Sequence, residues 1–412
     1  MTDILRRTIR WTAALKASLF MLFLVFMLRS TPYADDYFEL RDGLSNSRLV
    51  FERTGKGRVV FLGGSITAMK GWRELVCSDL KKRFPNTEFD FINAGIPSTG
   101  STPGSFRLVR DAFKNGKVDL LFEEAAVNDF YNGRSGKEQV RAMEGIVRHA
   151  RKLNPNIDII LMYFVDPEKI KTYNEGKIPD VIQNHEKVAV HYRLPSINMA
   201  LEVTERINHN EFTWENDFND LHPAPFGHTL YSNAIARLFD EAWLSRPAEN
   251  STITAHKDFE KLDEYCYDAA TLVSPDRADE LDGFRLDPKW INTVGGTTRP
   301  EFVDVPMLVA HNPGDSFALS FRGSAIGLFV AAGPDAGIIE YRIDDGSWKK
   351  QDLFTKWSAG LHIPWLYVLE AELEKTTPHR LKVRISSEKN QQSTDHACRI
   401  VNFAINQEFE LK

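Results

Sequence analysis

The sequence is poor in cysteine and carries no excess of basic residues. Its 412 residues include only three cysteines, Cys77, Cys266 and Cys398, whose spacing matches no metal-binding motif. All three are interpreted as structural, with Cys266 and Cys398 a candidate disulfide pair if the chain is exported. The net charge of −6 argues against a nucleic-acid partner, because such proteins carry clustered Lys and Arg. No motif implies a metal or a cofactor, and the length allows two or three domains.

Long apolar runs are also scarce, and the one that stands out is close to the N-terminus. A basic segment precedes the apolar run Ala17–Leu28. Such a run is typical of a secretory signal and is short of the ~20 apolar residues that span a bilayer. We predict that residues 1–34 are an export signal, either cleaved or kept as a membrane anchor through residues 11–28. The protein is then secreted, periplasmic or anchored on the extracytoplasmic side.

The chain is organised around Arg58-Val-Val-Phe-Leu-Gly-Gly-Ser-Ile-Thr67. An apolar, β-branched run that ends in two glycines and a serine is typical of a buried parallel strand that leads into a tight turn. Ser65 would then begin the next helix, where free backbone N–H groups favour negative charge. The alternative is a serine that merely caps a helix after a glycine turn.

From Arg58 onward, strands alternate with helices. Apolar periodicity predicts strands near residues 58–63, 88–93, 118–126, 157–164 and 196–199, and helices near 71–84, 140–150 and 226–243. This alternation predicts a parallel sheet covered on both faces. Active sites of such sheets lie beyond the C-terminal ends of the strands. Ser65, the glycine-containing loop 95–101 and Asn128 all follow predicted strand ends.

The loop before the last of these helices contains Asn219-Asp-Leu-His222, with a carboxylate two residues before a histidine. The carboxylate can orient the imidazole while the other ring nitrogen faces a nucleophile, as in serine hydrolases. A histidine that only caps or packs beside Pro223 is the alternative. His228, in the following helix, is interpreted as structural.

Four segments together resemble the ordered motif blocks of the SGNH (GDSL-type) hydrolases. They are Gly-Gly-Ser-Ile at 63–66, the loop after Asn93, Ala-Val-Asn-Asp at 126–129 and Leu-His-Pro at 221–223. The resemblance covers residues 58–245 and implies a flavodoxin-like, three-layer α/β/α domain with serine esterase activity. The α/β-hydrolase fold is disfavoured, because Thr67 stands where Gly-x-Ser-x-Gly requires its last glycine.

The resemblance also implies roles for single residues. Ser65 is similar to the family nucleophile, and its backbone N–H to one oxyanion donor. His222 is similar to the general base, and Asn128 to the asparagine whose amide also donates to the oxyanion. The remaining donor falls at Ser98 or Gly100; we name Gly100 as the site residue and leave Ser98 open.

The predicted triad acid departs from the family pattern. The family aspartate stands three residues before the histidine, where this chain has Asn219. Asp220, one residue later, is the predicted acid. Asp217, or no acid at all in a Ser–His dyad, is the alternative.

Beyond residue 245 the pattern changes. A charged linker is predicted over 246–287 and an accessory domain over 288–412, with strands near residues 325–330, 338–343, 379–385 and 399–404 and a hairpin turn at 344–346. This half is predicted to be an antiparallel β-sandwich, and it resembles the jelly-roll modules found beside carbohydrate-esterase domains. Its aromatic side chains could stack on sugar rings or simply pack, namely Trp348, Trp357, Trp365 and Tyr367.

The sequence therefore predicts an exported serine esterase that removes O-acyl groups, in particular O-acetyl groups, from carbohydrate. An acylated carbohydrate or another small ester is the expected partner. Lipid or aryl esters, and O-acyl transfer by the same residues, stay open because a fold does not determine its substrate. A hypothesis of a different class is a glycan-binding protein whose hydrolase domain has decayed, which the departure at Asn219 motivates.

Overall fold

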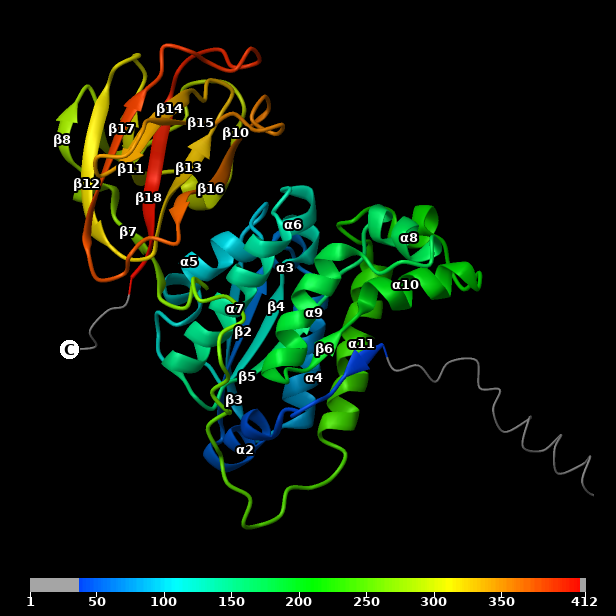
Figure 1. Cartoon of the computed structure of the whole chain (residues 1–412). Coiled ribbons are helices and arrows are strands. Elements are labelled where there is room, and N and C mark those ends of the chain that lie inside the picture. The colour runs from blue at the N-terminus through cyan, green and yellow to red at the C-terminus, as the bar shows by residue number, and fades with distance from the viewer. Residues whose placement is uncertain (1–36, 408–412) are drawn as a thin grey trace, which may run out of the picture. The chain divides into compact units, whose positions relative to one another are not determined.

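The computed structural model describes residues 37–407 (Figure 1). The predicted export segment, residues 1–34, and the proposed anchor at 11–28 lie outside these residues. Within the described part of the chain, no helix combines the length and the apolar character needed to cross a membrane.

The first half of the described chain is built on a six-stranded sheet. The strand order is β1 (Phe38–Glu39), β6 (Ser196–Ile197), β5 (Asp158–Met162), β4 (Leu120–Glu124), β2 (Lys56–Gly63) and β3 (Glu88–Gly95). All neighbours pair in parallel except β1, which runs antiparallel to β6. β4 and β5 are buried along their whole length, as expected for a sheet covered on both faces. The predicted parallel sheet is confirmed, although β4 ends before residue 126 because Ala126 begins a helix.

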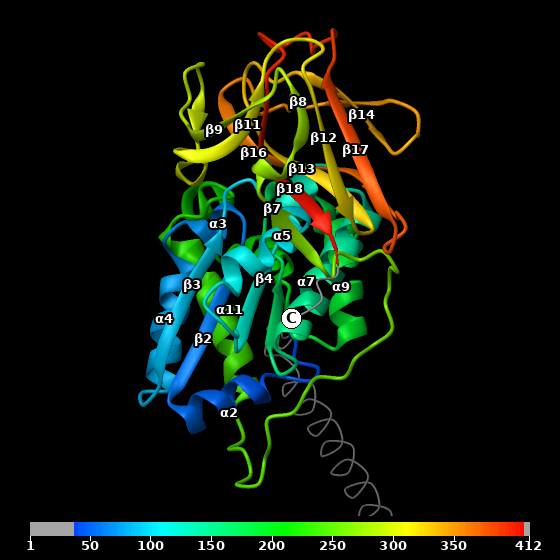
Figure 2. The same ribbon diagram turned by 90° about the vertical axis from the view of Figure 1, so that its left-hand side faces the viewer.

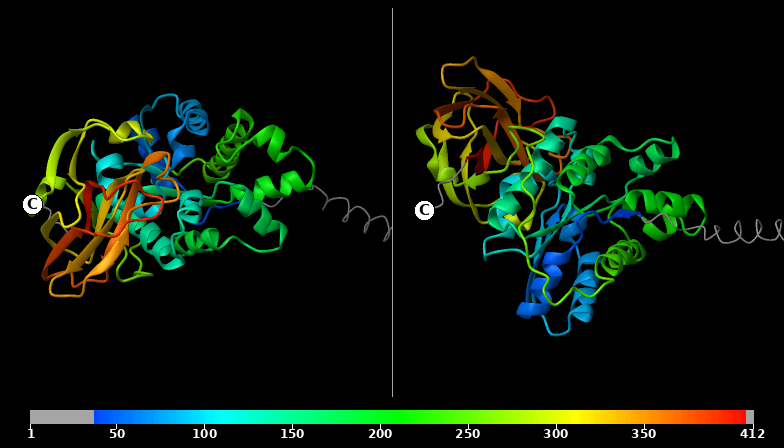
Figure 3. Two further views of the ribbon diagram at one scale, coloured as in Figure 1. Left: turned by 90° about the horizontal axis from the view of Figure 1, so that it is seen from above. Right: turned by 60° about the horizontal axis from the view of Figure 1, so that its bottom comes forward.

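Helices cover both faces of this sheet. In chain order they are α2 (Ser45–Thr54), α3 (Ser65–Ala68), α4 (Trp72–Arg83), α5 (Ser101–Ala112), α6 (Ala126–Tyr131), α7 (Gly136–Leu153), α8 (Pro167–Asn174), α9 (Asp180–Tyr192), α10 (Met199–Asn208), the π-helix η1 (Trp214–Phe218) and α11 (Pro225–Ala242). Helices α5, α7 and α9 lie on one face, and α4 and α11 pack together on the other (Figure 2). Helices α8 and α10 pack against each other on the β6 side of the sheet (Figure 3).

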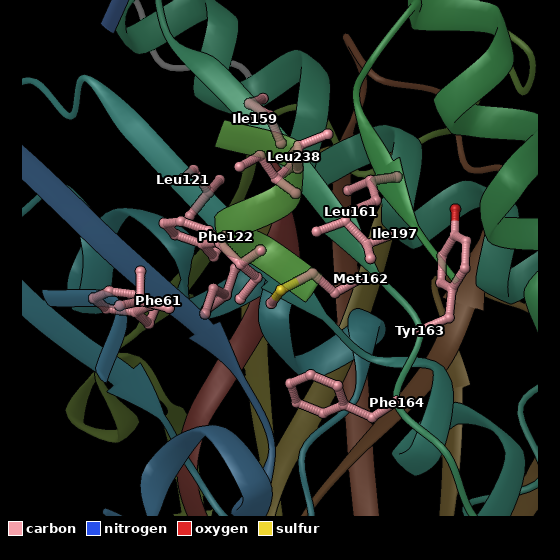
Figure 4. Close-up of a cluster of buried hydrophobic side chains, with 14 of the residues drawn as sticks. Phe61, Leu121, Phe122, Ile159, Leu161, Met162, Tyr163, Phe164, Ile197 and Leu238 are labelled. Carbon is pink, nitrogen blue, oxygen red and sulfur yellow. The ribbon is translucent and has the colours of Figure 1, made fainter. Parts of the chain in front are cut away.

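The core of this α/β part is aromatic where strands and helices meet. Figure 4 shows side chains from β2, β4, β5, β6 and α11 gathered in one cluster. Phe61 of β2 stacks on Phe122 of β4, with 5.0 Å between the ring centroids. Trp72, at the start of α4, packs edge-on against Phe61 and Phe164. This packing holds the C-terminal ends of the strands at one edge, where the predicted site residues lie.

Several helices of the α/β part were not predicted from the sequence. Helix α5 buries Ser101, Thr102 and Ser105, and α2 buries Asn46 and Ser47 beside its apolar side chains. Because part of the buried face of each helix is polar, apolar residues alone do not mark that face. Helices α8, α9 and α10 were also not predicted.

The second half of the described chain is rich in β-strands. One seven-stranded sheet contains β10 (Thr297–Thr298), β16 (Leu361–Ala371), β13 (Ala325–Ala332), β18 (Cys398–Asn406), β11 (Val305–Ala310) and β9 (Arg285–Trp290), with β7 (Ala270–Val273) also on β18. A five-stranded sheet contains β15 (Lys349–Asp352), β14 (Ile338–Ile343), β17 (Pro378–Ile385), β12 (Ser316–Arg322) and β8 (Asp279–Asp282).

These two sheets confirm the predicted antiparallel β-rich domain. Apart from the parallel pair β10–β16, neighbouring strands run antiparallel. The predicted hairpin turn joins β14 to β15. Strands β7 and β8 lie inside the range 246–287 that the sequence assigns to a linker.

The candidate disulfide between Cys266 and Cys398 does not form, because both thiols are free and buried. The strand register explains why. Ala270 of β7 pairs with Asn406 at the end of β18, whereas Cys398 is the first residue of β18. The two cysteines therefore lie near opposite ends of this strand. Burial raises the pKa of each thiol to about 12, as expected of inert structural cysteines.

Candidate active site

The turn that carries Ser65 is closed by two glycines for reasons of space. Gly63 ends β2, and a Cβ built on it would lie 2.4 Å from Thr67 Oγ1. A Cβ on Gly64 would lie 1.9 Å from the side-chain oxygen of Asn128. Neither contact tolerates a methyl group. The turn therefore brings Ser65, the first residue of α3, directly beside Asn128 of α6.

His222 reaches the serine from the loop between η1 and α11. Its Nε2 lies 2.7 Å from Ser65 Oγ, a hydrogen-bond distance. The imidazole is 45% exposed, so the pair is open to a ligand from solvent. The structure thus brings together two predicted residues that are 157 positions apart in the chain.

Of the two candidate acids, Asp220 lies nearer to the imidazole. Its Oδ1 is 3.8 Å from His222 Nδ1 and accepts the backbone N–H of His222 at 3.2 Å. Its side chain is 63% exposed. Asp217 instead accepts the N–H of Thr213 at 2.7 Å. Thr213 is the N-cap of η1, so the Asp217 carboxylate is part of the cap of this helix. Asn219, at the family position of the acid, has a φ of +71°, and the loop thereby turns between the two aspartates.

The loop after β3 supplies backbone donors near the turn that carries Ser65, since a Cβ on Gly64 would lie 3.2 Å from the Thr99 carbonyl. Its Thr99 N–H donates to the Ile96 carbonyl at 3.2 Å, and its Ser101 N–H donates to Asp129 Oδ1 at 2.9 Å. The N–H groups of Ser98 and Gly100 have no acceptor among residues 37–407. Ser98 has a φ of +71°, a conformation that favours glycine. Both positions named from the sequence thus retain a free donor in this loop.

A buried arginine ties this loop to strand β2. Arg107 of α5 is fully buried, and its guanidinium donates to the carbonyls of Ala94 at 2.5 Å and Gly63 at 2.9 Å. It also donates to the Thr99 hydroxyl at 3.3 Å. One side chain therefore holds the ends of β2 and β3 and the loop 96–100, which we call the donor loop. A buried, hydrogen-bonded guanidinium is a rigid anchor, because its planar fork keeps a single geometry.

Buried carboxylates surround the C-terminal end of β4. Glu124 accepts the N–H of Val127 at 3.2 Å, and burial raises its pKa to about 7. Burial raises the pKa of neighbouring Glu123 well above its usual range.

Among residues 37–407, no group of three or more His, Cys, Asp or Glu side chains is arranged to hold a metal ion.

The arrangement has the parts that acyl transfer requires. A hydroxyl contacts a proton acceptor, and backbone and amide donors lie beside it at the strand ends. Such donors stabilise the negative oxygen of a tetrahedral intermediate. No sequence pattern marked Arg107 or His185, which frame these groups from buried helix faces. Asp129, which also frames them, ends the Ala-Val-Asn-Asp segment but was assigned no role from the sequence.

The four aromatic residues named as sugar contacts differ in environment. The Trp365 ring faces the guanidinium of Arg134 at 5.5 Å, and the Tyr367 hydroxyl donates to the Leu353 carbonyl at 3.0 Å. These two side chains pack within the protein, whereas Trp348 and Trp357 are exposed.

Comparison with known proteins agrees with this geometry. A model of the GDSL-like Lipase/Acylhydrolase family matches residues 61–230. The matched segment contains all four motifs, which confirms the resemblance inferred from them. The match places the protein in the class of carboxylic ester hydrolases.

Solved structures extend the likeness to the β-rich part. A two-domain esterase (CEX) active on acetylated mannans, co-crystallised with mannopentaose, is similar over 92% of this chain and 99% of that chain, with 21% identity and a TM-score of 0.70. Another structure of a two-domain esterase (CEX) active on acetylated mannans is similar over 91% of this chain and 98% of that chain, with 21% identity and a TM-score of 0.70. An acetylxylan esterase from Geobacillus stearothermophilus covers 44% of this chain and 93% of its own, with 18% identity and a TM-score of 0.35. None of the curated proteins that were compared matches the chain. The first two likenesses show that the two-domain fold is shared.

Proposed function

We propose that the protein is a serine esterase that removes O-acetyl groups from carbohydrate. The observation that carries the proposal is the 2.7 Å contact between Ser65 Oγ and His222 Nε2. This contact lies at the C-terminal ends of the parallel strands, beside free N–H donors, which is where α/β sheets bind their ligands. The match to an acylhydrolase family over the same residues supports it.

In the proposed mechanism, His222 Nε2 takes the proton of Ser65 as Oγ bonds to the ester carbonyl carbon. The resulting oxyanion accepts hydrogen bonds from the Ser65 N–H, the Asn128 amide and an N–H of the Ser98–Gly100 segment. Collapse breaks the ester bond, and the imidazolium gives its proton to the departing sugar oxygen, which leaves as a hydroxyl. Water then attacks the acyl-enzyme with the same base, which releases the carboxylic acid and restores Ser65.

Asp220 is proposed to stabilise the imidazolium from the solvent side. Both groups are about half exposed, so solvent weakens their attraction, and the 3.8 Å separation is longer than a hydrogen bond. Asp220 therefore contributes less than a buried triad aspartate would.

We expect Asp220→Asn to lower kcat by roughly tenfold to a hundredfold, well short of the ~10⁴-fold known for a buried triad aspartate. Asp217→Asn, the matched control, should leave kcat within about twofold, because its carboxylate caps η1. Steady-state hydrolysis of an activated acetyl ester measures both variants. A larger loss in Asp217→Asn than in Asp220→Asn would reverse the assignment of the acid.

A carbohydrate substrate is supported by a cavity beside α6, which Ser65 and His222 themselves do not line. Phe130, two residues after Asn128, is 44% exposed and lines a cavity of about 990 Å³ together with charged and amide side chains of α7, α8 and α9. An exposed ring among polar groups suits a sugar, which offers an apolar face and several hydroxyls. The esterase similar in fold acts on acetylated mannans. Export through residues 1–34, which we propose, would place the enzyme where extracellular polysaccharide is found.

The experiment that tests this function compares acetate release from acetylated mannan with release from a small aryl acetate. We expect turnover of both, and we expect Phe130→Ala to raise KM roughly tenfold on the polysaccharide alone, because it removes one stacking surface. Val190→Ala is the matched control, since Val190 is also exposed but belongs to α9 outside the cavity. Turnover of the aryl ester without any of the polysaccharide would contradict the carbohydrate substrate. Polysaccharide binding without turnover of either would favour the glycan-binding alternative.

A further inference from the structure

Asp129 is a fully buried carboxylate next to the oxyanion residue Asn128. Its Oδ1 accepts the Ser101 N–H at 2.9 Å. Its Oδ2 accepts the Ser101 hydroxyl at 2.5 Å and contacts His185 Nε2 at 3.0 Å. A buried carboxylate is costly unless such hydrogen bonds satisfy it, and these three contacts define its position on every side.

The contacts of Asp129 fasten one end of the donor loop to α6. Ser101 is the first residue of α5 and Gly100 is its N-cap. A Cβ built on Gly100 would lie 2.1 Å from Asp129 Oδ1, so the Gly100 backbone touches the carboxylate. Asn132, at the end of α6, donates its amide to the Ser98 carbonyl at 3.0 Å. Residues at the C-terminal half of α6 therefore hydrogen-bond to the loop at Ser98 and again at Ser101.

His185 holds the carboxylate from the opposite side. It is fully buried on α9, and its Nδ1 has no hydrogen-bond partner among the described residues. A neutral imidazole with the proton on Nε2 satisfies this arrangement, because a protonated Nδ1 would be a buried donor without an acceptor. His185 then donates to Asp129, which leaves the carboxylate free to accept both groups of Ser101.

We infer that Asp129, held by His185, is a positioning residue that sets the spacing between the Asn128 amide and the backbone donors of the Ser98–Gly100 segment. Asn128 and Asp129 are joined by a peptide bond, so one anchored carboxylate determines the place of both donor groups. The inference rests on the proposed function, since these donors matter only if an oxyanion forms.

The expected consequence is a loss of transition-state binding alone. Oxyanion donors act on charge that develops during the reaction, so their misplacement lowers kcat and leaves KM nearly unchanged. A displacement of about 1 Å can cost roughly a hundredfold in rate. In Asp129→Asn, an amide N–H₂ replaces one acceptor oxygen and faces the donors of Ser101 or His185.

The test is carried out on the full chain with an aryl acetate. Asp129→Asn should lower kcat by roughly tenfold to a hundredfold, while KM stays within about threefold. Each kcat is expressed per active site, and the active sites are counted by titration with a fluorophosphonate. His185→Leu should act in the same direction, and His185→Gln should recover most of the rate, because a glutamine amide can donate where Nε2 does. Asp335→Asn is the matched control. Asp335 is also buried, pairs with Arg399 in the β-rich part, and should lower Tm without changing kcat per titrated site.

The outcomes separate this inference from the proposed function. If Asp129→Asn keeps a kcat within twofold of the unaltered protein, or if His185→Gln is as slow as His185→Leu, the positioning role is wrong while the esterase stands. A loss that appears only as fewer titratable sites and a lower Tm would also overturn it, since that is what a purely structural role predicts. If the unaltered chain hydrolyses no ester at all, the proposed function and this inference fail together.

Discussion

Replacement of Ser65 by alanine is expected to lower kcat for an acetyl ester by roughly 10⁴-fold or more, with little change in KM. The hydroxyl is the atom that bonds to the acyl carbon in the proposed mechanism, and no other hydroxyl contacts His222 among residues 37–407. His222→Ala should cost a similar factor, because Ser65 then loses its proton acceptor. The double variant should be no slower than either single variant, since residues that act as a unit are not additive.

The measurement is initial-rate hydrolysis of an aryl acetate, with acetate release followed separately to exclude slow non-enzymatic cleavage. Ser232→Ala and His191→Gln are matched controls, because Ser232 lies on α11 and His191 on α9 without contact to the Ser65–His222 pair. Both controls should keep normal kcat and Tm. Turnover by Ser65→Ala above a tenth of the normal rate would exclude this serine as the nucleophile.

The Ser65–His222 pair could be predicted because each residue belongs to a local pattern. Ser65 follows an apolar run and two glycines, and His222 follows an aspartate in a loop before a long amphipathic helix. Local patterns of this kind survive in a single sequence. The strands and the pattern of the last helix set both residues at the same edge of the sheet, and the contact itself then follows from the fold.

The supports of the site could not be predicted, because they depend on distant contacts. His185 meets Asp129 across 56 residues, and it lies on α9, a helix that was not predicted. Arg107 has the appearance of an ordinary helix-surface residue, yet it is fully buried and serves two strand ends and the donor loop. A buried polar side chain leaves no apolar repeat, so only the folded partners reveal it.

The choice of the acid shows the same limit on a smaller scale. The sequence favours Asp220, two residues before His222, and leaves Asp217 as the alternative. What separates them is the π-helical turn η1, whose cap uses the Asp217 carboxylate. A π-helical turn has no recognised pattern in the sequence and is rare, so the sequence alone leaves Asp217 open as the alternative.

The second large effect is expected from removal of the β-rich part. A chain that ends at residue 261 should be insoluble or have a strongly lowered Tm, and it should have lost most of its esterase activity. The reason is a shared hydrophobic cluster. Ile96 of the donor loop, Phe106 of α5 and Ala142 of α7 belong to one buried cluster with residues of the β-rich part such as Met307 and Leu366.

The segment that follows residue 261 is docked onto α7 as well. Glu144 accepts the N–H groups of Leu262 and Asp263 at 2.6 and 2.8 Å. Tyr267 lies so close to the helix that a Cβ on Gly145 would come within 2.8 Å of its backbone, and its ring packs on Phe106 at 4.9 Å. Truncation would therefore expose apolar surface directly beneath the donor loop, at a cost of about 25 cal/mol per Å².

Soluble yield, thermal unfolding and dye binding to exposed apolar surface test this expectation against a chain that lacks only residues 408–412. The short deletion should behave normally, because it leaves every strand of both β-sheets in place. A truncated chain that is monomeric and fully active would contradict the argument, and the β-rich part would then be a separable module. If the truncated chain instead unfolds, the β-rich part supports the catalytic domain through Ile96 and Phe106, and any role in holding the polysaccharide is additional to that support.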